Sequence, residues 1–224
     1  MRKRSTTITD GTRKTGRDYG LVVAAAAAVV AGVVLGGHYW RTVKTPTPEI
    51  GGFVLPEPKA LPAFDLVDEQ GQPFRAANFA GAWSFLYFGY TSCPDICPLT
   101  LIGLEAVKKL LAERMPGTRT EYYLVSVDPA RDTPHKLLEY VTYFDPAFHG
   151  VTGATQDLKS LAEGTGSVFF VPESQGDDSY LVSHSSNIVL LDPEGRFAAV
   201  FTPPHEPKQV AADFERIVAY RGRP

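Results

Sequence analysis

Both cysteines of this 224-residue chain, Cys93 and Cys97, lie in one short segment and form a C-x3-C pair. The segment joins an apolar run that is typical of a buried strand to a run with helical spacing, so both sulfurs stand at a strand-to-helix junction. Without a third cysteine, the chain has no thiol for another disulfide. The pair is therefore a redox couple, a site for a soft metal ion, or a single disulfide that closes a short loop.

An uncharged segment near the N-terminus predicts one transmembrane helix. Leu21 to Trp40 carries no charged side chain, and at about 1.5 Å per residue it spans the roughly 30 Å hydrocarbon core of a bilayer. A cleaved signal peptide would have a shorter apolar region of about 7–15 residues followed by small residues, whereas this run ends in bulky aromatic side chains. We therefore expect a retained anchor over residues 21–40.

The charges on either side of this segment predict its orientation. Residues 1–20 contain six basic side chains, whereas only Arg41 and Lys44 closely follow the anchor. Because basic residues stay on the cytoplasmic side, we expect a cytoplasmic tail over residues 1–20 and an exported domain from Thr45 onward. The tail is short and unlike a transit peptide, so a bacterial inner (plasma) membrane with a periplasmic domain is favoured over the mitochondrial inner membrane.

The net charge of the exported part argues against a nucleic-acid partner. Residues 1–40 hold six basic and two acidic side chains, whereas the remaining residues hold 16 basic and 23 acidic side chains, a net charge of −7. A domain that binds nucleic acid carries a basic surface, which this composition does not supply. An acidic domain is compatible with a cationic cargo.

The order of the expected elements after the anchor predicts an α/β domain with a thioredoxin-like fold. Prolines and two adjacent glycines make residues 41–61 an extended linker, and residues 62–224 have the length of one domain. A βαβ unit joined to a ββα unit is the thioredoxin-like arrangement, a central mixed sheet flanked by helices, here with a β-hairpin as an N-terminal extension. The expected elements are the hairpin at 64–75, strands at 83–90, 122–127 and 168–171, helices at 99–115, 133–144 and 155–162, a second hairpin at 187–201, and a closing helix at 207–220.

The residues around the cysteine pair predict an acidic thiol at Cys97. Pro98 has no N–H group and a fixed φ, which suits the first position of a helix and makes Cys97 the expected N-cap. Its sulfur would face unpaired N–H groups at the positive end of the helix dipole, so we expect a lowered pKa. A thiolate is the form that attacks disulfides and binds soft metal ions.

One histidine is placed to complete a metal site with the two sulfurs. His184 lies in a polar break before the expected strand at 188–191, and in a thioredoxin-like fold the start of that strand faces the cysteine loop. Two thiolates leave a d¹⁰ ion under-coordinated, so an imidazole there would be a third ligand; the alternative is a hydrogen-bonded loop histidine. The other histidines are expected to be surface or helix-entry residues, namely His38, His135, His149 and His205.

Two aspartates follow the strand that neighbours the cysteine loop. Asp128 ends the expected strand at 122–127 and is a candidate to support a metal ligand by hydrogen bonding. For Asp132, which precedes Thr133 and Pro134, ordinary turn and cap chemistry is the expected role.

Four segments, in this order, resemble the SCO/SenC family of membrane-anchored, copper-binding assembly factors of cytochrome c oxidase. They lie at residues 87–98, which hold both cysteines, at 125–134, a DPxRDTP-like segment, at 151–153, and at 180–185. The resemblance implies copper, as Cu(I), Cu(II) or both, held by Cys93, Cys97 and His184. It also implies a recipient such as the CuA centre of oxidase subunit II or another copper protein, and a periplasmic copper donor. Many members have Asp before the ligand histidine, where this chain has Ser183.

Two classes of function remain compatible with the sequence. A non-enzymatic copper metallochaperone uses all three residues, whereas a thiol–disulfide oxidoreductase that reduces the recipient's cysteines, or a redox sensor, uses only Cys93 and Cys97 as its reactive residues. The second class gives His184 no role, so we expect the metallochaperone. A peroxidase of the same fold would need one peroxidatic cysteine among polar activating groups, which a proline-flanked C-x3-C pair matches poorly.

Overall fold

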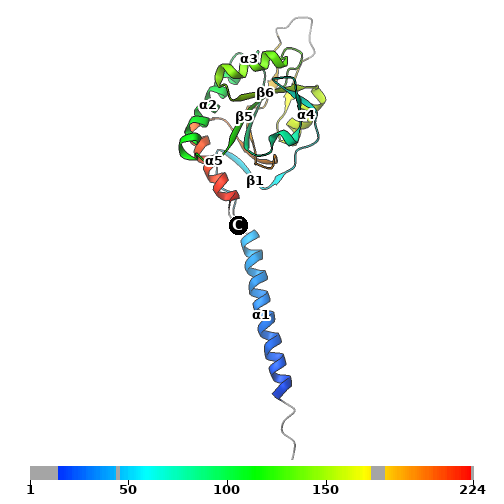
Figure 1. The fold of residues 1–224 in the computed structure, drawn as a ribbon, viewed down its shortest axis with the longest axis vertical. Coiled ribbons are helices and arrows are strands. Elements are labelled where there is room, and N and C mark those ends of the chain that lie inside the picture. Colours follow the sequence, from blue (N-terminus) through cyan, green and yellow to red (C-terminus); the bar gives the residue numbers. More distant parts are fainter. Residues whose placement is uncertain (1–14, 44–45, 173–179, 223–224) are drawn as a thin grey trace, which may run out of the picture. The chain divides into compact units, whose positions relative to one another are not determined.

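The computed structural model describes residues 15–43, 46–172 and 180–222 (Figure 1). The chain divides into two compact units, Met1–Pro46 and Thr47–Pro224. The described part of the first unit is a helix, and the second unit is a mixed α/β domain.

Helix α1 (Thr15–Val43) has the length and composition of a membrane anchor. It contains an 18-residue apolar window, Gly20–Gly37, none of which is buried within the protein. Apolar side chains that no protein surface covers suit contact with lipid, so the helix fits the predicted anchor. Of the tail predicted over residues 1–20, residues 1–14 lie outside the described residues.

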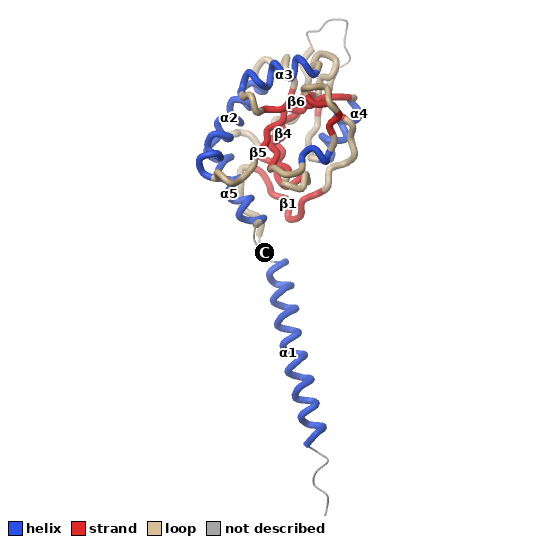
Figure 2. The backbone as a smooth tube through the Cα atoms, viewed as in Figure 1, coloured by secondary structure: helices blue, strands red, loops and turns tan. Residues whose placement is uncertain are grey.

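An eight-stranded sheet organises the second unit (Figures 1 and 2). In spatial order its strands are β1 (Gly52–Lys59), β10 (Phe197–Phe201), β9 (Ile188–Leu191), β4 (Trp83–Gly89), β5 (Thr120–Ser126), β6 (Phe148–Gly153), β2 (Leu66–Asp68) and β3 (Pro73–Phe74). The helices are α2 (Ile96–Arg114), α3 (Pro134–Phe144), α4 (Thr155–Gly164) and α5 (Pro207–Arg221), and a short 3₁₀ helix, η1 (Ala76–Phe79), precedes β4. The pairs β4–β5 and β5–β6 are parallel and the other pairs are antiparallel, so the sheet is mixed.

Strand β4 lies at the centre of the sheet, between β9 and β5, and all seven of its residues are buried. Phe85 of β4 stacks on Tyr122 of β5 and Phe201 of β10, with ring centroids 5.1 and 5.9 Å away. Phe214 of α5 packs against the same ring, and α2 and α5 lie side by side (Figure 1). A mixed sheet flanked by helices, with the β2–β3 hairpin before it, confirms the predicted thioredoxin-like fold.

One strand of the central sheet lies where the sequence pattern does not predict it. β6 pairs with β5 although His149, Gly150 and Thr152 interrupt its apolar pattern. The run at 168–171, predicted as a strand of the main unit, instead contributes only β7 (Phe169–Phe170), which pairs with β8 (Ser183–His184) in a separate two-stranded sheet. The run has the apolar composition of a core strand, but part of it is exposed to solvent.

The segment predicted as a linker, residues 41–61, is in part a strand of the sheet. β1 pairs antiparallel with β10, and its Val54 and Leu55 are buried. Prolines keep a chain extended, and an extended chain suits an edge strand as well as a tether, so composition does not separate the two. The prediction of a free linker is therefore wrong for β1 (Gly52–Lys59), which is part of the sheet.

Removing β1 is expected to destabilise the domain. A fragment that begins at Thr47 keeps β1, whereas a fragment that begins at Pro62 loses buried Val54 and Leu55 and exposes the edge of β10. Because burying each such side chain contributes about 1.5–3 kcal/mol, we expect the free energy of unfolding of the shorter fragment to be lower by about 3 kcal/mol or more. Urea unfolding followed by circular dichroism checks this, and equal midpoints for the two fragments would show that β1 adds no stability.

Candidate metal centre

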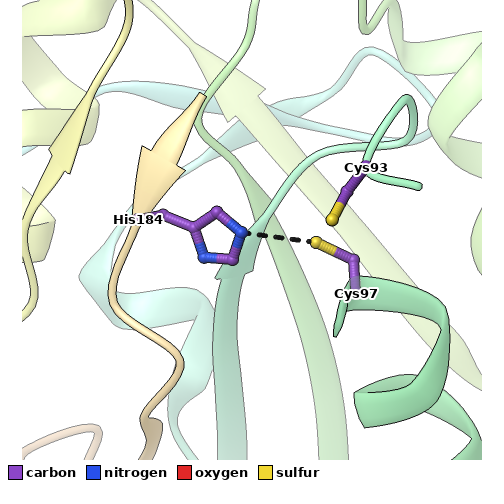
Figure 3. A group of neighbouring side chains, drawn as sticks. All are labelled: Cys93, Cys97 and His184. Atoms are coloured by element: carbon purple, nitrogen blue, oxygen red, sulfur yellow. Dashed lines mark hydrogen bonds between the residues drawn. The ribbon is translucent and has the colours of Figure 1, made fainter. Parts of the chain in front are cut away.

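Cys93, Cys97 and His184 come together from three segments beyond the carboxyl end of β4 (Figure 3). Cys93 lies in the loop after β4, Cys97 in the first turn of α2, and His184 in β8. One possible ligand atom of each residue lies within 4.8 Å of the other two, and Nε2 of His184 lies 3.5 Å from Sγ of Cys97. The structure therefore gathers the three predicted ligands into one cluster.

Helix α2 begins before Cys97, not after it. Asp95 is the N-cap and Ile96 is the first helical residue, so the prediction of Cys97 as N-cap is wrong. Pro98 consequently occupies the third helical position. Proline is tolerated there because the first N–H groups of a helix have no partner within the helix.

Burial, rather than the helix terminus, dominates the acidity of Cys97. Removal of the thiol from water, reinforced by hydrogen bonding with Cys93, raises its pKa to about 12. A backbone hydrogen bond at Tyr90 and the hydroxyl of Tyr87 oppose this rise without cancelling it. The predicted lowered pKa of Cys97 is therefore wrong. Because a cysteine ligand must lose its proton, metal binding at Cys97 is coupled to proton release.

Two residues of β4 set the position of the Cys97 sulfur. A Cβ atom at Gly89 would lie 2.9 Å from Sγ of Cys97, so the absence of a side chain at Gly89 makes room for the sulfur. The hydroxyl of Tyr87 lies 3.9 Å from the same Sγ and donates a hydrogen bond to it. The sequence gives one signal of this arrangement, a glycine at the end of an otherwise bulky buried strand.

His184 presents an unprotonated nitrogen to Cys97. Its Nδ1 lies 3.0 Å from the carbonyl oxygen of Ser185, and because a carbonyl only accepts hydrogen bonds, Nδ1 carries the proton. Burial lowers the pKa of His184, so the ring is neutral at pH 7 and the lone pair of Nε2 faces the sulfur. Tyr87 and Tyr90 contact the imidazole edge-on, with centroids 5.8 and 5.9 Å away. This tautomer is the one that binds a metal ion through Nε2.

The site opens to solvent beside the small β7–β8 sheet. A groove of about 340 Å³ there is lined by His184, Ser183 and the exposed side chains of Val168 and Phe170, among others. Cys93 is half-buried, whereas Cys97 is buried. The groove therefore gives access to His184, whereas Cys93 does not line it and is accessible through its own partial exposure.

Comparison with known protein families matches residues 55–219 to the family SCO1/SenC. This chain belongs to the SCO1/SenC family. The mitochondrial protein SCO1 homolog 1 of Arabidopsis thaliana is 37% identical over 143 residues, which are 64% of this chain and 42% of that protein, so the chain spans less than half of its length. Among solved structures, copper-bound ScoI of Arabidopsis thaliana is 33% identical, with a TM-score of 0.67 over 72% of this chain and 99% of that one. Copper-bound ScoI of Bradyrhizobium japonicum is 30% identical, with a TM-score of 0.59 over 70% and 98%.

The structure places Asp128 against the segment that carries His184 rather than against a metal ligand. Its carboxylate is fully buried, pairs with Arg131, and accepts a 2.7 Å hydrogen bond from the hydroxyl of Tyr180. Tyr180 precedes His184 by four residues. These hydrogen bonds of Asp128 go to Tyr180 and Arg131, so its support of a metal ligand stays a prediction.

Asp132 has a larger role than the predicted turn chemistry. Its buried carboxylate accepts hydrogen bonds from the backbone N–H and the hydroxyl of Thr91, at 2.9 and 2.5 Å, so it is bonded to the cysteine loop. Thr133 caps α3, since its hydroxyl accepts a hydrogen bond from the N–H of Lys136. Thr91 is 41 residues from Asp132 in the sequence, so no local pattern distinguishes this aspartate from an ordinary turn residue.

The remaining histidines of the second unit do not join the cluster. His38 lies in α1, in the other compact unit, and His135 is exposed on α3. His149 pairs with a buried glutamate across the strands, and Nε2 of His205 donates to the carbonyl of Ser186, 2.6 Å away. In the part of the chain that the structure describes, the cluster therefore offers two sulfurs and one nitrogen.

That ligand set suits a soft metal ion. Thiolates favour Cu(I), zinc and iron–sulfur clusters, and imidazole suits copper and zinc. A structural zinc site is closed by four protein ligands, whereas three ligands leave a position at which another molecule can bind. The arrangement is therefore chemically suited to an ion that also accepts a ligand from another molecule.

Proposed function

We propose that this protein is a copper metallochaperone that binds copper through Cys93, Cys97 and His184. The observation that carries the proposal is the neutral imidazole of His184, whose Nε2 lies 3.5 Å from Sγ of Cys97. The copper-bound relatives from Arabidopsis thaliana and Bradyrhizobium japonicum support copper as the cargo. Two thiolates favour Cu(I), and an imidazole is also a good ligand for Cu(II).

A second function, thiol–disulfide exchange, is favoured by a separate observation. Cys93 and Cys97 are both free thiols, and their sulfurs lie within 4.8 Å of each other. Such a pair can form a disulfide reversibly and so reduce the copper-ligand cysteines of a recipient, or sense the redox state. This function makes no use of His184, and it is therefore the alternative rather than the main proposal.

The proposed recipient and location follow from the family and from α1. The Sco family is described as one of cytochrome c oxidase assembly proteins, so we assign the CuA centre of oxidase subunit II as the recipient, supplied through a periplasmic copper donor. The apolar helix would anchor the protein in a bacterial inner membrane, with its basic N-terminus in the cytoplasm and the second unit, Thr47–Pro224, in the periplasm. The net negative charge of residues 41–224 argues against nucleic acid as a partner.

The full chain in detergent is expected to bind one equivalent of Cu(I). An anaerobic titration against a chromophoric Cu(I) chelator measures this, and the double variant Cys93→Ser/Cys97→Ser should lose the binding because no soft ligand remains. Equally tight binding by the double variant would place copper elsewhere and contradict the proposal. Weak binding by the parent would leave thiol–disulfide exchange as the function.

A further inference from the structure

The turn that joins β5 to α3, residues 128–132, lies between the two segments that carry the proposed metal ligands. Its backbone is held internally, since the N–H groups of Arg131 and Asp132 both donate to the carbonyl of Asp128, at 3.2 and 3.0 Å. The side chains of both aspartates are fully buried. A buried carboxylate must be compensated by hydrogen-bond partners, so those partners show what each aspartate holds in place.

Asp132 holds the loop that carries Cys93. Its Oδ2 accepts from the N–H of Thr91 at 2.9 Å, and its Oδ1 accepts from the hydroxyl of Thr91 at 2.5 Å. Lys136 bridges the same carboxylate and the next loop residue, with Nζ 3.3 Å from Asp132 Oδ1 and 3.4 Å from the hydroxyl of Ser92. These bonds restrain the two residues immediately before Cys93.

Asp128 and Arg131 hold the segment that carries His184. Asp128 accepts from the hydroxyl of Tyr180 at 2.7 Å and pairs with Arg131. Arg131 donates from Nη1 to the carbonyl of Tyr180 at 3.0 Å, and its guanidinium lies 3.7 Å from the centroid of the Tyr180 ring. Tyr180 is thus restrained through its hydroxyl, its ring and its backbone.

We propose that the turn 128–132 is a clamp that sets the spacing between the cysteine loop and His184. We call Asp132, which bonds to Thr91, the cysteine arm of the clamp. We call Asp128 and Arg131, which bond to Tyr180, its histidine arm. The residues of the clamp are positioning residues, because they act on the segments that carry the ligands. The inference rests on the proposed copper function, yet the two arms have different signatures. The cysteine arm acts directly on the loop that carries Cys93, whereas the histidine arm reaches the thiols mainly through His184, whose Nε2 lies 3.5 Å from Sγ of Cys97.

Tyr180→Phe tests the histidine arm. The substitution keeps the ring over Arg131 and removes only the hydroxyl that donates to Asp128. We expect the Cu(I) affinity of the full chain in detergent to fall about 10-fold, as is typical when a group that orients a metal ligand is lost. The equilibrium of the Cys93–Cys97 thiols with glutathione should shift less than in Thr91→Val, since this arm reaches the sulfurs only through the contact between His184 and Cys97.

Thr91→Val tests the cysteine arm with a side chain of the same shape. It removes the hydroxyl that donates to Asp132, so we expect the Cu(I) affinity to fall by about the same factor. Here the glutathione equilibrium should also shift, by about 3-fold or more. In that reaction the two thiols of the protein pass two electrons and two protons to glutathione disulfide, giving the Cys93–Cys97 disulfide and two molecules of reduced glutathione.

Asp213→Asn is the matched control, because Asp213 is a buried carboxylate of α5 that belongs to neither arm. It accepts from the N–H of Gly51 and pairs with Arg216. The control should lower the urea midpoint and leave both equilibria unchanged. The clamp is overturned if Tyr180→Phe and Thr91→Val likewise change only the urea midpoint.

A parent protein that fails to bind Cu(I) would refute the proposed function without deciding the clamp. The clamp would then be judged on the glutathione equilibrium alone. A shift in Thr91→Val together with a smaller shift in Tyr180→Phe would support it, and identical equilibria in the parent and both variants would refute it.

Discussion

Replacing His184 by alanine is expected to lower the affinity for Cu(I) by about 100-fold or more. The substitution removes the one nitrogen ligand of the cluster, and loss of a group that merely orients a ligand already costs about 10–100-fold. The Cys93–Cys97 disulfide should still form, because neither sulfur is changed. Anaerobic Cu(I) competition on the full chain, together with a count of free thiols before and after oxidation, measures both effects.

His135→Ala is the control for this experiment. His135 is exposed on α3 and does not belong to the cluster, so its removal should leave the Cu(I) affinity at the parent's value. If the His184→Ala and His135→Ala variants bind Cu(I) equally well, the imidazole of His184 is not a ligand. The protein would then be better described as a thiol–disulfide exchange protein.

Cys97 is expected to react with iodoacetamide at least about 100-fold more slowly than Cys93 at pH 8. Burial raises the pKa of Cys97 to about 12, so only about one molecule in 10⁴ carries the reactive thiolate at that pH. Cys93 is half-buried and therefore more accessible to the reagent. Mass spectrometry of the single-cysteine variants Cys93→Ser and Cys97→Ser separates the two rates.

The pH dependence of the same reaction tests its cause. A raised pKa keeps the thiol protonated over the ordinary range, so the rate at Cys97 should rise about tenfold for each pH unit from 8 to 11. A rate that levels off below pH 9 would contradict this expectation. It would mean that the N-terminus of α2 stabilises the thiolate more than burial destabilises it.

An element is predictable from the sequence when its own residues carry the signal, either as a continuous apolar pattern or as a helix cap. β4 is covered on both faces, so nearly every one of its residues is apolar, and that continuous pattern is visible without knowledge of its neighbours. The start of α3 is signalled by Thr133 and Pro134, which act within one helical turn. The β9–β10 hairpin is likewise predicted by two apolar runs around a turn.

Elements that depend on distant partners are not predictable in this way. β6 has a broken apolar pattern and is a strand because β5 and β2 lie on either side of it. β1 is proline-containing and extended, and only its pairing with β10 makes it part of the sheet. A short apolar run, 168–171, shows the converse, since an apolar pattern alone does not ensure a place in the core.

The sequence by itself determined which residues meet at the site, because a strand that ends in a C-x3-C pair and a late histidine are typical of one fold and family. Only the tertiary structure decided their chemistry. The tautomer of His184 depends on the carbonyl of Ser185, and the pKa of Cys97 depends on burial beneath Tyr87 and other core residues. Hydrogen bonding and desolvation act through space over a few ångströms. They depend on the backbone conformation that the fold gives Ser185 and on the side chains that it packs around Cys97, and no spacing of residue types records either.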